Sequence, residues 1–319
     1  MKKVLILAPR LDCMFKEGPV PAERGSISPI RQHWKRFIDG MINEYSFRNS
    51  HSVKVIELPL WQFSTQLVDE LGADIVFVPH KEKHNFSITN GKAYYYMQTV
   101  FPWMFSVDQK GWGGGASKYP FDVDSYAEDP NCFLKYKERI SLNQSKFDQP
   151  SFKEIAIPDD YVFFPCQIPH DETIRWHSTI SVESAFEETC KVTRDMHIGM
   201  VAKGHPVNPG SMQGLKEISK KYPHVIWYDD VSIHQLIPQA RCVVVVNSGT
   251  GMESLLHKVP VITFGKAEYD VVTNKSDLYN LKEIIKNPKF DEKRVYKFFN
   301  AWDDWCYDSN VKLNYCKLP

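Results

Sequence analysis

The sequence lacks the features typical of nucleic-acid-binding, membrane-spanning and disulfide-stabilised proteins. Its 39 basic and 39 acidic residues cancel, so no excess of positive charge is present to attract nucleic acid or an anionic membrane. The first apolar run ends at Pro9, which makes it too short for a signal peptide or a membrane span. The seven cysteines are odd in number, widely spaced and without a CxxC pair, which favours a reducing compartment and argues against structural zinc. We therefore expect a cytoplasmic protein with no transmembrane segment and no nucleic-acid partner.

The common nucleotide, metal and hydrolase motifs are absent as well. The chain contains neither a Walker A loop nor GxGxxG, and no HxxxH or HExxH pair falls on a predicted helix. Ser248 lies in NSGTG, whereas a serine hydrolase needs GxSxG and Val246 takes the place of the first glycine. We therefore predict no bound metal ion and no serine hydrolase.

Short apolar runs alternate with amphipathic segments along most of the chain, which is typical of parallel α/β sheets. In the first half, strands are predicted at residues 4–8, 53–58 and 74–79. In the second half, strands are predicted at residues 161–166, 198–202, 225–228, 242–246 and 261–264. We therefore predict an α/β fold with two Rossmann-like domains facing each other across a crevice, comprising residues 1–150 and residues 151–319, the latter with terminal helices.

Residues 80–148 interrupt this alternation. Several aromatic residues crowd between Tyr94 and Phe105, and we interpret the three consecutive tyrosines there as core. The glycine run from Gly111 to Gly115 is typical of a mobile lid or a flexible surface loop, and Trp112 within it suits either the core or a sugar face. Residues 117–150 are polar and contain prolines, which predicts a linker or an exposed insertion with the domain boundary near its end.

The most informative stretch is a buried strand followed by a loop of small polar residues. Four consecutive valines end at Val246 and precede N-S-G-T-G and a short amphipathic helix. Such a loop can bind phosphate, because its backbone can approach the anion and the helix dipole favours negative charge. Ser248, Gly249 and Thr250 then contact the phosphate, and Glu253 accepts a hydrogen bond from a ribose or sugar hydroxyl. The alternative is a plain helix cap, with Ser248 or Thr250 as the cap and Glu253 completing a capping box.

Polar clusters also follow two other predicted strands of the second half. Gln167, Asp171 and Glu172 follow one strand, and Lys203 and His205 follow the next. Because parallel strands end at the same edge of a sheet, these clusters and the small-residue loop are expected to converge. Asp171 or Glu172 then serves as nucleophile or base, and Lys203 and His205 neutralise a phosphate or carboxylate. Each residue also has a structural explanation: Asp171 as a cap, His205 as a buried hydrogen-bonding residue and Lys203 as a solvated charge.

In order along the chain, three motifs resemble the bacterial capsule polysaccharide biosynthesis family, which includes the retaining β-Kdo transferases. These motifs are QIPHD at Gln167, KGHP at Lys203 and NSGTGMESLLHKVPVITFG at Asn247. The resemblance covers roughly residues 161–269. It implies a GT-B glycosyltransferase with a CMP-activated ulosonic acid such as Kdo as donor and a glycan or glycolipid as acceptor.

The resemblance further implies a role for each candidate residue. Asp171 lies nearest the anomeric carbon and attacks it in a retaining double displacement, and we place Glu172 and His205 with it as catalytic residues. No metal cofactor is required, because protein cations and helix amides stabilise the departing nucleotide. The implied donor-binding residues are Gln167, Lys203, Ser248, Gly249, Thr250 and Glu253.

Two other functions fit the same sequence. The first is a transferase or epimerase that uses a UDP- or GDP-hexose. It differs from the ulosonate hypothesis in the charge of the donor sugar. An ulosonate carboxylate needs a cation near the anomeric centre, which Lys203, His205 or Arg175 can supply. The second is an inactive glycan- or nucleotide-binding module, in which Asp171 and Glu172 point away from the crevice. A lipid-linked acceptor would add peripheral membrane contact.

Overall fold

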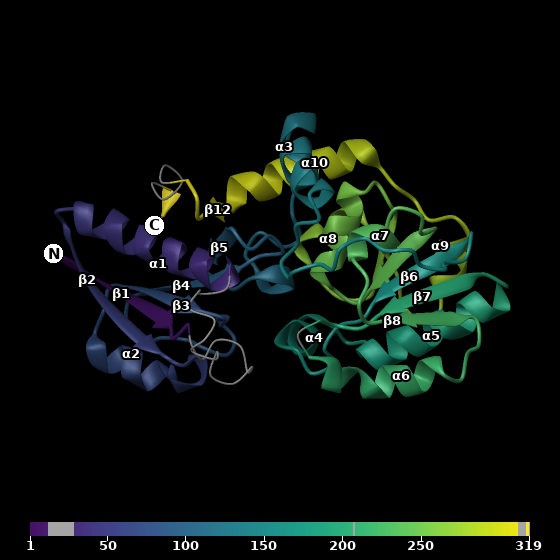
Figure 1. Cartoon of the computed structure of the whole chain (residues 1–319). Helices are drawn as coiled ribbons and strands as arrows, with labels where there is room; N and C mark the ends of the chain where they lie inside the picture. The colour runs from purple at the N-terminus through teal and green to yellow at the C-terminus, as the bar shows by residue number, and fades with distance from the viewer. Residues whose placement is uncertain (12–28, 207, 312–316, 319) are drawn as a thin grey trace. The chain divides into compact units, whose positions relative to one another are not determined.

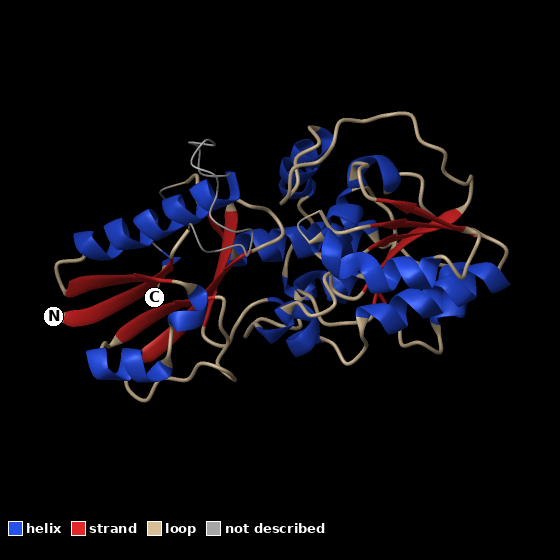
Figure 2. Ribbon diagram, turned by 60° about the horizontal axis from the view of Figure 1, so that its bottom comes forward, coloured by secondary structure: helices blue, strands red, loops and turns tan. Residues whose placement is uncertain are grey.

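The computed structural model describes residues 1–11, 29–206, 208–311 and 317–318. Two compact units divide the chain, one formed by Met1–Ser117 with Asp304–Pro319 and the other by Lys118–Asp303. Each unit is built on its own six-stranded sheet with helices on both faces (Figures 1 and 2). The predicted α/β fold with two parallel-dominated sheets is therefore confirmed.

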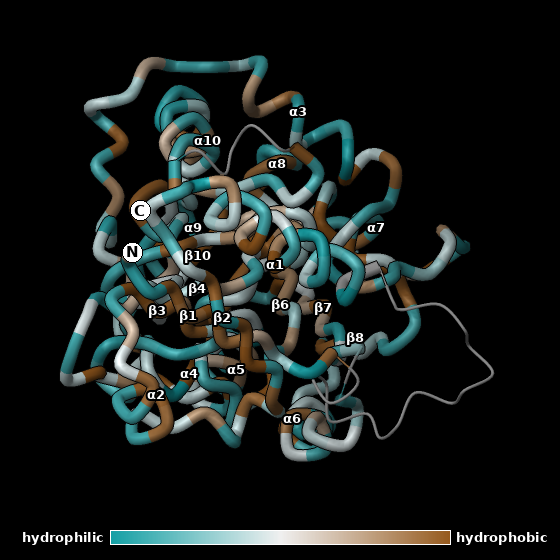
Figure 3. Tube along the Cα trace, turned by 90° about the vertical axis from the view of Figure 1, so that its left-hand side faces the viewer, coloured by the Kyte–Doolittle hydropathy of each residue, from teal (hydrophilic) through white to brown (hydrophobic). Residues whose placement is uncertain are grey.

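The first unit holds a sheet in the order β12-β5-β4-β3-β1-β2. Its strands are β1 (Lys2–Pro9), β2 (His51–Leu58), β3 (Ile75–Pro79), β4 (Lys92–Gln98), β5 (Met104–Asp108) and β12 (Tyr307–Asp308). The first four pair in parallel, whereas β5 and β12 are antiparallel to their neighbours. Hydrophobic residues, brown in Figure 3, gather in strands such as β1, whose last six residues are buried.

Two helices cover the faces of this sheet, α1 (Pro29–Phe47) and α2 (Thr65–Leu71). The buried side of α1 presents Trp34, Phe37, Met41 and Tyr45 at helical spacing. The predicted core position of the three tyrosines in β4 is confirmed: Tyr94 and Tyr96 pack on the α1 side, and Tyr95 packs on the α2 side. Their alternation follows from the two-residue period of a strand.

The glycine-rich loop at residues 111–115 is fastened to the rest of the first unit. The carboxylate of Asp108 accepts hydrogen bonds from the backbone nitrogens of Lys110 (2.7 Å) and Gly111 (3.2 Å). A β-carbon added to Gly111 would lie 2.7 Å from Cγ of the buried Glu82, so the loop needs glycine to pass this side chain. Trp112 is only 5% exposed. The expectation of a surface loop was therefore wrong, and Trp112 belongs to the core.

The second unit holds an all-parallel sheet in the order β11-β10-β9-β6-β7-β8. Its strands are β6 (Tyr161–Pro165), β7 (Gly199–Lys203), β8 (Val225–Tyr228), β9 (Cys242–Val245), β10 (Val261–Thr263) and β11 (Asn274–Lys275). The chain runs from β6 outward through β7 to β8 and then returns to β9 on the other side of β6. The strand order therefore reverses between β6 and β9, and this reversal is where such sheets bind ligands.

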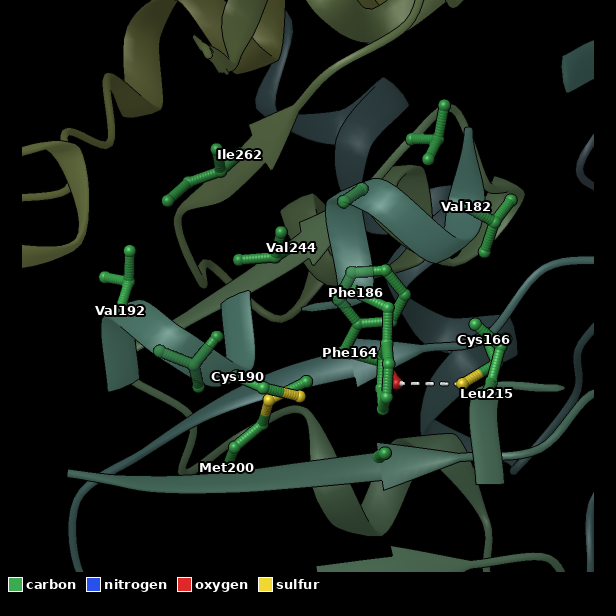
Figure 4. Close-up of a cluster of buried hydrophobic side chains, with 14 of the residues drawn as sticks. Phe164, Cys166, Val182, Phe186, Cys190, Val192, Met200, Leu215, Val244 and Ile262 are labelled. Carbon is green, nitrogen blue, oxygen red and sulfur yellow. Dashed lines mark hydrogen bonds between the residues drawn. The ribbon is translucent and has the colours of Figure 1, made fainter. Parts of the chain in front are cut away.

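Both faces of this sheet are covered, which explains its continuous apolar strands. The helices are α4 (Glu172–His177), α5 (Val182–Asp195), α6 (Gln213–Ser219), α7 (Ile233–Leu236), α8 (Gly249–Leu256) and α9 (Leu281–Lys286). One core cluster packs Phe164, Met200 and Val244 of the strands against Phe186 and Cys190 of α5 (Figure 4). This core fixes the strand ends that carry the candidate site.

Residues predicted to be a linker instead contain α3 (Pro130–Ser141), which packs on α10 (Glu292–Trp305). Phe133 and Phe299 meet edge to face at 5.5 Å, as do Tyr136 and Trp302. This packing places the division between units after Ser117, whereas the sequence suggested residue 150. The last residues also differ from the predicted arrangement, because β12 pairs with β5 of the first unit.

No helix within the described ranges is long and apolar enough to cross a membrane.

Candidate functional site

The candidate site lies at the carboxyl edge of the second sheet, where β9, β6 and β7 are neighbours. Lys203 is the last residue of β7, and the segments that follow the three strands carry the other eight candidate catalytic and donor-binding residues. The edge includes the reversal of strand order between β6 and β9. Within the described part of the chain, no group of three or more His, Cys, Asp and Glu is arranged to hold a metal ion.

Gln167 joins the ends of β6 and β9. Its side-chain oxygen accepts hydrogen bonds from the backbone nitrogens of Val246 and Asn247, both at 3.1 Å. Its amide nitrogen donates to Oδ1 of Asn247 at 2.9 Å. Asn247 in turn donates to the backbone oxygen of Thr173 in α4 at 2.9 Å. Because Gln167 and Asn247 are buried, these bonds clamp the strand ends and the start of α4 together. Gln167 thus has a structural role that the sequence did not reveal.

Asp171 caps α4 and also acts on the site. Its Oδ1 accepts hydrogen bonds from the backbone nitrogen (2.9 Å) and hydroxyl (2.8 Å) of Thr173. The predicted capping alternative is therefore confirmed. The side chain is partly buried, and its negative charge acts electrostatically on His205 and Lys146. Glu172, the first residue of α4, is also partly buried. Capping thus fixes the Asp171 carboxylate near a histidine and a lysine.

The structure changes the expected environment of the two basic residues at the end of β7. Burial lowers the pKa of His205 to about 4; Asp171 opposes this shift, and Lys203 and Lys146 add to it. Without a bound anion, His205 is therefore neutral at pH 7. Lys203 is 3% exposed, and the charges of Asp229 and Asp230 oppose the lowering of its pKa by burial. Lys203 is therefore buried and is not the solvated charge suggested as its structural explanation.

The small-residue loop forms the amino-terminal cap of α8. Oγ of Ser248 accepts a hydrogen bond from the backbone nitrogen of Thr250 at 3.2 Å, so the predicted cap is confirmed. The predicted capping box is wrong, because capping by Ser248 puts Gly251, not Glu253, at the third helical position. Gly249 and Thr250 are partly exposed in the first turn, where backbone N–H groups favour an anion.

Glu253 is buried, with only 3% of its surface exposed. It accepts a hydrogen bond from the hydroxyl of Ser145, and Nε2 of His234 lies 4.0 Å from its Oε1. Burial lowers the pKa of His234 to about 4, so this imidazole is neutral at pH 7 and makes no ion pair. Burial raises the pKa of Glu253 to about 7, against the opposing effects of Ser145 and Lys146. Glu253 is thus a buried carboxyl whose protonation changes near neutral pH.

The raised pKa of Glu253 predicts a pH-dependent stability difference between the wild type and Glu253→Gln. The folded protein holds this proton more tightly than the unfolded chain, whose carboxyl has its ordinary pKa of 4.5. The contribution of Glu253 to stability is therefore complete below pH 4.5 and is lost as the pH rises to about 7. The free energy of unfolding of Glu253→Gln, relative to that of the wild type, should therefore increase by about 3 kcal/mol between pH 4.5 and pH 8. Urea unfolding across this range measures the gain, and parallel pH profiles would contradict it.

Gly251 is required by a ring that packs against α8. A β-carbon at this position would lie 2.5 Å from Oη and 2.7 Å from Cε2 of the buried Tyr269, whose hydroxyl donates to the backbone oxygen of Ser248. Gly251→Ala should therefore lower the free energy of unfolding by about 2 kcal/mol. In the matched control Gly214→Ala, in α6, the new β-carbon meets no atom within 4 Å. This control should keep or raise the melting temperature, because alanine favours helix more than glycine does. Equal melting temperatures for the two variants would contradict the prediction.

Three residues of the site come from the segment that the sequence analysis assigned to a linker. Ser145 bonds Glu253, Lys146 acts on Asp171 and Glu253, and the Phe147 ring meets the His205 ring edge to face at 5.3 Å. No motif or hydrophobic period distinguishes these residues in the sequence. They reach the site because α3 turns the following segment back over the sheet edge.

The comparisons with known proteins bear on the family and the fold of the chain. The family described as "Capsule polysaccharide biosynthesis protein" matches residues 126–300, more than half of the chain. The capsule polysaccharide modification protein LipB of Neisseria meningitidis serogroup A is 24% identical over 205 residues, covering 58% of this chain and 48% of LipB. The capsule polysaccharide export protein KpsS of Escherichia coli is 27% identical over 156 residues, covering 44% of this chain and 39% of KpsS. The chain thus spans less than half the length of these relatives.

Two solved structures share the fold. KpsC of Thermosulfurimonas dismutans, described as a beta Kdo 2,7 transferase, gives a TM-score of 0.51 at 18% identity and covers 93% of this chain and 90% of its own. The structure of KpsC described as a beta Kdo 2,4 transferase gives a TM-score of 0.50 at 15% identity. This match covers 78% of this chain and 83% of the KpsC chain. The chain has a GT-B-like fold and belongs to the capsule polysaccharide biosynthesis protein family.

Proposed function

We propose that the protein is a glycosyltransferase that moves a CMP-activated ulosonic acid such as Kdo to a glycan or glycolipid acceptor. The observation that carries this proposal is the position of Asp171, held by its cap beside the neutral His205 at the carboxyl edge of the second sheet. The buried Glu253 and the α8 amino terminus, both suited to a nucleotide, belong to the same edge. Membership of the capsule family and the fold shared with two Kdo transferases support the proposal.

In the proposed reaction, a carboxylate oxygen of Asp171 attacks the anomeric carbon of the donor. A bond forms between Asp171 and that carbon, and the bond to the phosphate oxygen breaks, so CMP leaves with the electron pair. An acceptor hydroxyl then displaces Asp171, and neutral His205 takes the hydroxyl proton. Two inversions give net retention. Glu172, next to Asp171 on α4, is a second candidate for the base.

The donor nucleotide would lie over the start of α8. First-turn amides of α8 that the Ser248 cap does not use, such as that of Gly249, favour the negative phosphate, and Glu253 accepts a hydrogen bond from a ribose hydroxyl. Protein cations and these amides balance the charge of the departing CMP, so the proposal requires no metal ion.

A transfer assay tests this function. The purified protein is incubated with CMP-Kdo and capsule-type acceptor glycans, and the product is analysed by mass spectrometry and by NMR of the anomeric centre. Transfer with retained configuration supports the proposal, and transfer with inversion would contradict the double displacement. Transfer from UDP- or GDP-hexoses alone would show that the donor is a nucleotide hexose and not CMP-Kdo. Nucleotide binding without transfer from any donor would indicate an inactive binding module.

A further inference from the structure

A short segment of the second unit lies across the candidate site and is anchored at both ends. We call residues 143–149 the strap. At one end, Oδ1 of Asn143 accepts a hydrogen bond from the hydroxyl of Ser232 at 2.6 Å. At the other end, Oε1 of Gln149 accepts from the backbone nitrogen of Ile233 at 3.0 Å. Both anchors reach the start of α7, so the strap forms a loop whose middle is held above the sheet edge.

The middle of the strap contacts two parts of the site. The Ser145 hydroxyl donates a hydrogen bond to the buried Glu253 carboxylate. Two residues later, the Phe147 ring packs against the His205 ring with centroids 5.3 Å apart. Lys146 stands between these two contacts in the chain. Its backbone is therefore fixed by neighbours on both sides, one bonded to Glu253 and one packed against His205.

Lys146 is partly buried, and three carboxylates act on it electrostatically. Burial lowers the pKa of its ammonium group, and the negative charges of Asp171, Glu268 and Glu253 oppose that shift. Among the described residues, its ammonium makes no hydrogen bond and no ion pair. The lysine side chain is therefore close to the site and is not committed to one carboxylate.

Of the three cations suggested by the sequence, Arg175 is exposed in the last turn of α4, and the other two do not supply such a charge. His205 is neutral at pH 7, because burial lowers its pKa to about 4. The Lys203 ammonium is buried near Asp229, which also pairs with Lys216 at 2.7 Å. A departing phosphate still needs a balancing charge. Lys146 is placed to provide it.

We infer that Lys146, presented by the strap, binds the donor phosphate between Glu253 and Asp171. The inference rests on the proposed function, in which Glu253 contacts the ribose and Asp171 faces the anomeric carbon. In a CMP-linked sugar the phosphate joins the ribose to the anomeric carbon. A cation whose charge acts on both carboxylates is therefore positioned for the phosphate, and it gains most from the extra charge that develops as CMP leaves.

The test compares CMP with cytidine, which lacks the phosphate, by isothermal titration calorimetry. In Lys146→Gln the affinity for CMP should fall about 10-fold to 100-fold, whereas the affinity for cytidine should stay at the wild-type value. Lys146→Arg should restore much of the CMP affinity, because it returns the charge. The matched control is Lys153→Gln, since Lys153 is 46% exposed, lies further along the same connection and pairs with Asp230 at 3.1 Å. It should leave both affinities unchanged.

The outcomes separate this inference from the proposed function. Equal CMP affinity in the wild type and Lys146→Gln would overturn the role of Lys146 while leaving the CMP donor in place. A loss seen with CMP-Kdo but not with CMP would overturn the phosphate assignment in favour of the sugar carboxylate. The wild type could also bind UDP in place of CMP. If Lys146→Gln then weakens the binding of UDP but not of uridine, the CMP-linked donor is overturned and the phosphate-binding role of Lys146 is supported. Binding of none of these compounds by the wild type would overturn both.

Discussion

Replacing Asp171 by asparagine is expected to abolish sugar transfer while leaving the fold intact. The asparagine oxygen can still accept the two hydrogen bonds from Thr173 that cap α4, so stability should change by less than about 1 kcal/mol. The amide cannot replace the carboxylate as a nucleophile. In the proposed double displacement, the rate of transfer should therefore fall roughly 10³-fold or more.

The measurement is the initial rate of transfer from CMP-Kdo, made alongside a thermal melt of each variant. Asp129→Asn is the matched control, because Asp129 caps α3 through Asn131 and Cys132, at 2.9 Å and 3.0 Å, away from the sheet edge. It should retain wild-type activity and a similar melting temperature. Asp171→Asn with more than about a tenth of the wild-type rate would contradict the nucleophile assignment.

Replacing Gln167 by alanine should cause the largest loss of stability among the site variants. It removes three hydrogen bonds and leaves the backbone nitrogens of Val246 and Asn247, together with the Asn247 side-chain oxygen, without their partner in a buried environment. Each unsatisfied buried group costs about 1–3 kcal/mol, so the free energy of unfolding should fall by about 3–5 kcal/mol. The effect should appear without any donor present, because the role is to hold strand ends.

Urea unfolding followed by circular dichroism measures this loss. The control Gln213→Ala removes one exposed hydrogen bond, from Gln213 to Glu217 at 2.6 Å, and should change stability by less than about 0.5 kcal/mol. If Gln167→Ala is as stable as the wild type but binds CMP poorly, Gln167 is a donor-binding residue and the structural role derived from its hydrogen bonds is wrong.

The central strands of both sheets were predictable from the sequence because they are buried on both faces, whereas β4 and β5 were not predicted. The valine run of β9 and the aromatic run of β6 have no polar face, which marks them without any tertiary information. The helix α3 was missed because its buried stripe is short and lies between polar, proline-bearing segments. Its stability comes from packing on α10, which is far away in the sequence.

The candidate site was predictable only in part. Three motifs pointed to one sheet edge, because parallel strands carry their carboxyl ends to the same side. The neutral state of His205 was not predictable, since it depends on burial in the folded chain. The strap was also hidden, because Ser145 and Lys146 belong to no motif and reach Glu253 only through the path of the folded chain.

Thermal stabilisation by nucleotides tests the central claim most directly. The purified protein is melted with CMP, UMP, UDP and GDP, since a ligand that binds only the folded state raises the melting temperature. At concentrations about 100-fold above its dissociation constant, CMP should stabilise the protein by roughly 2.7 kcal/mol, with little effect from UDP and GDP. Stabilisation by UDP or GDP without CMP, or by none of the four, would contradict a CMP-linked donor.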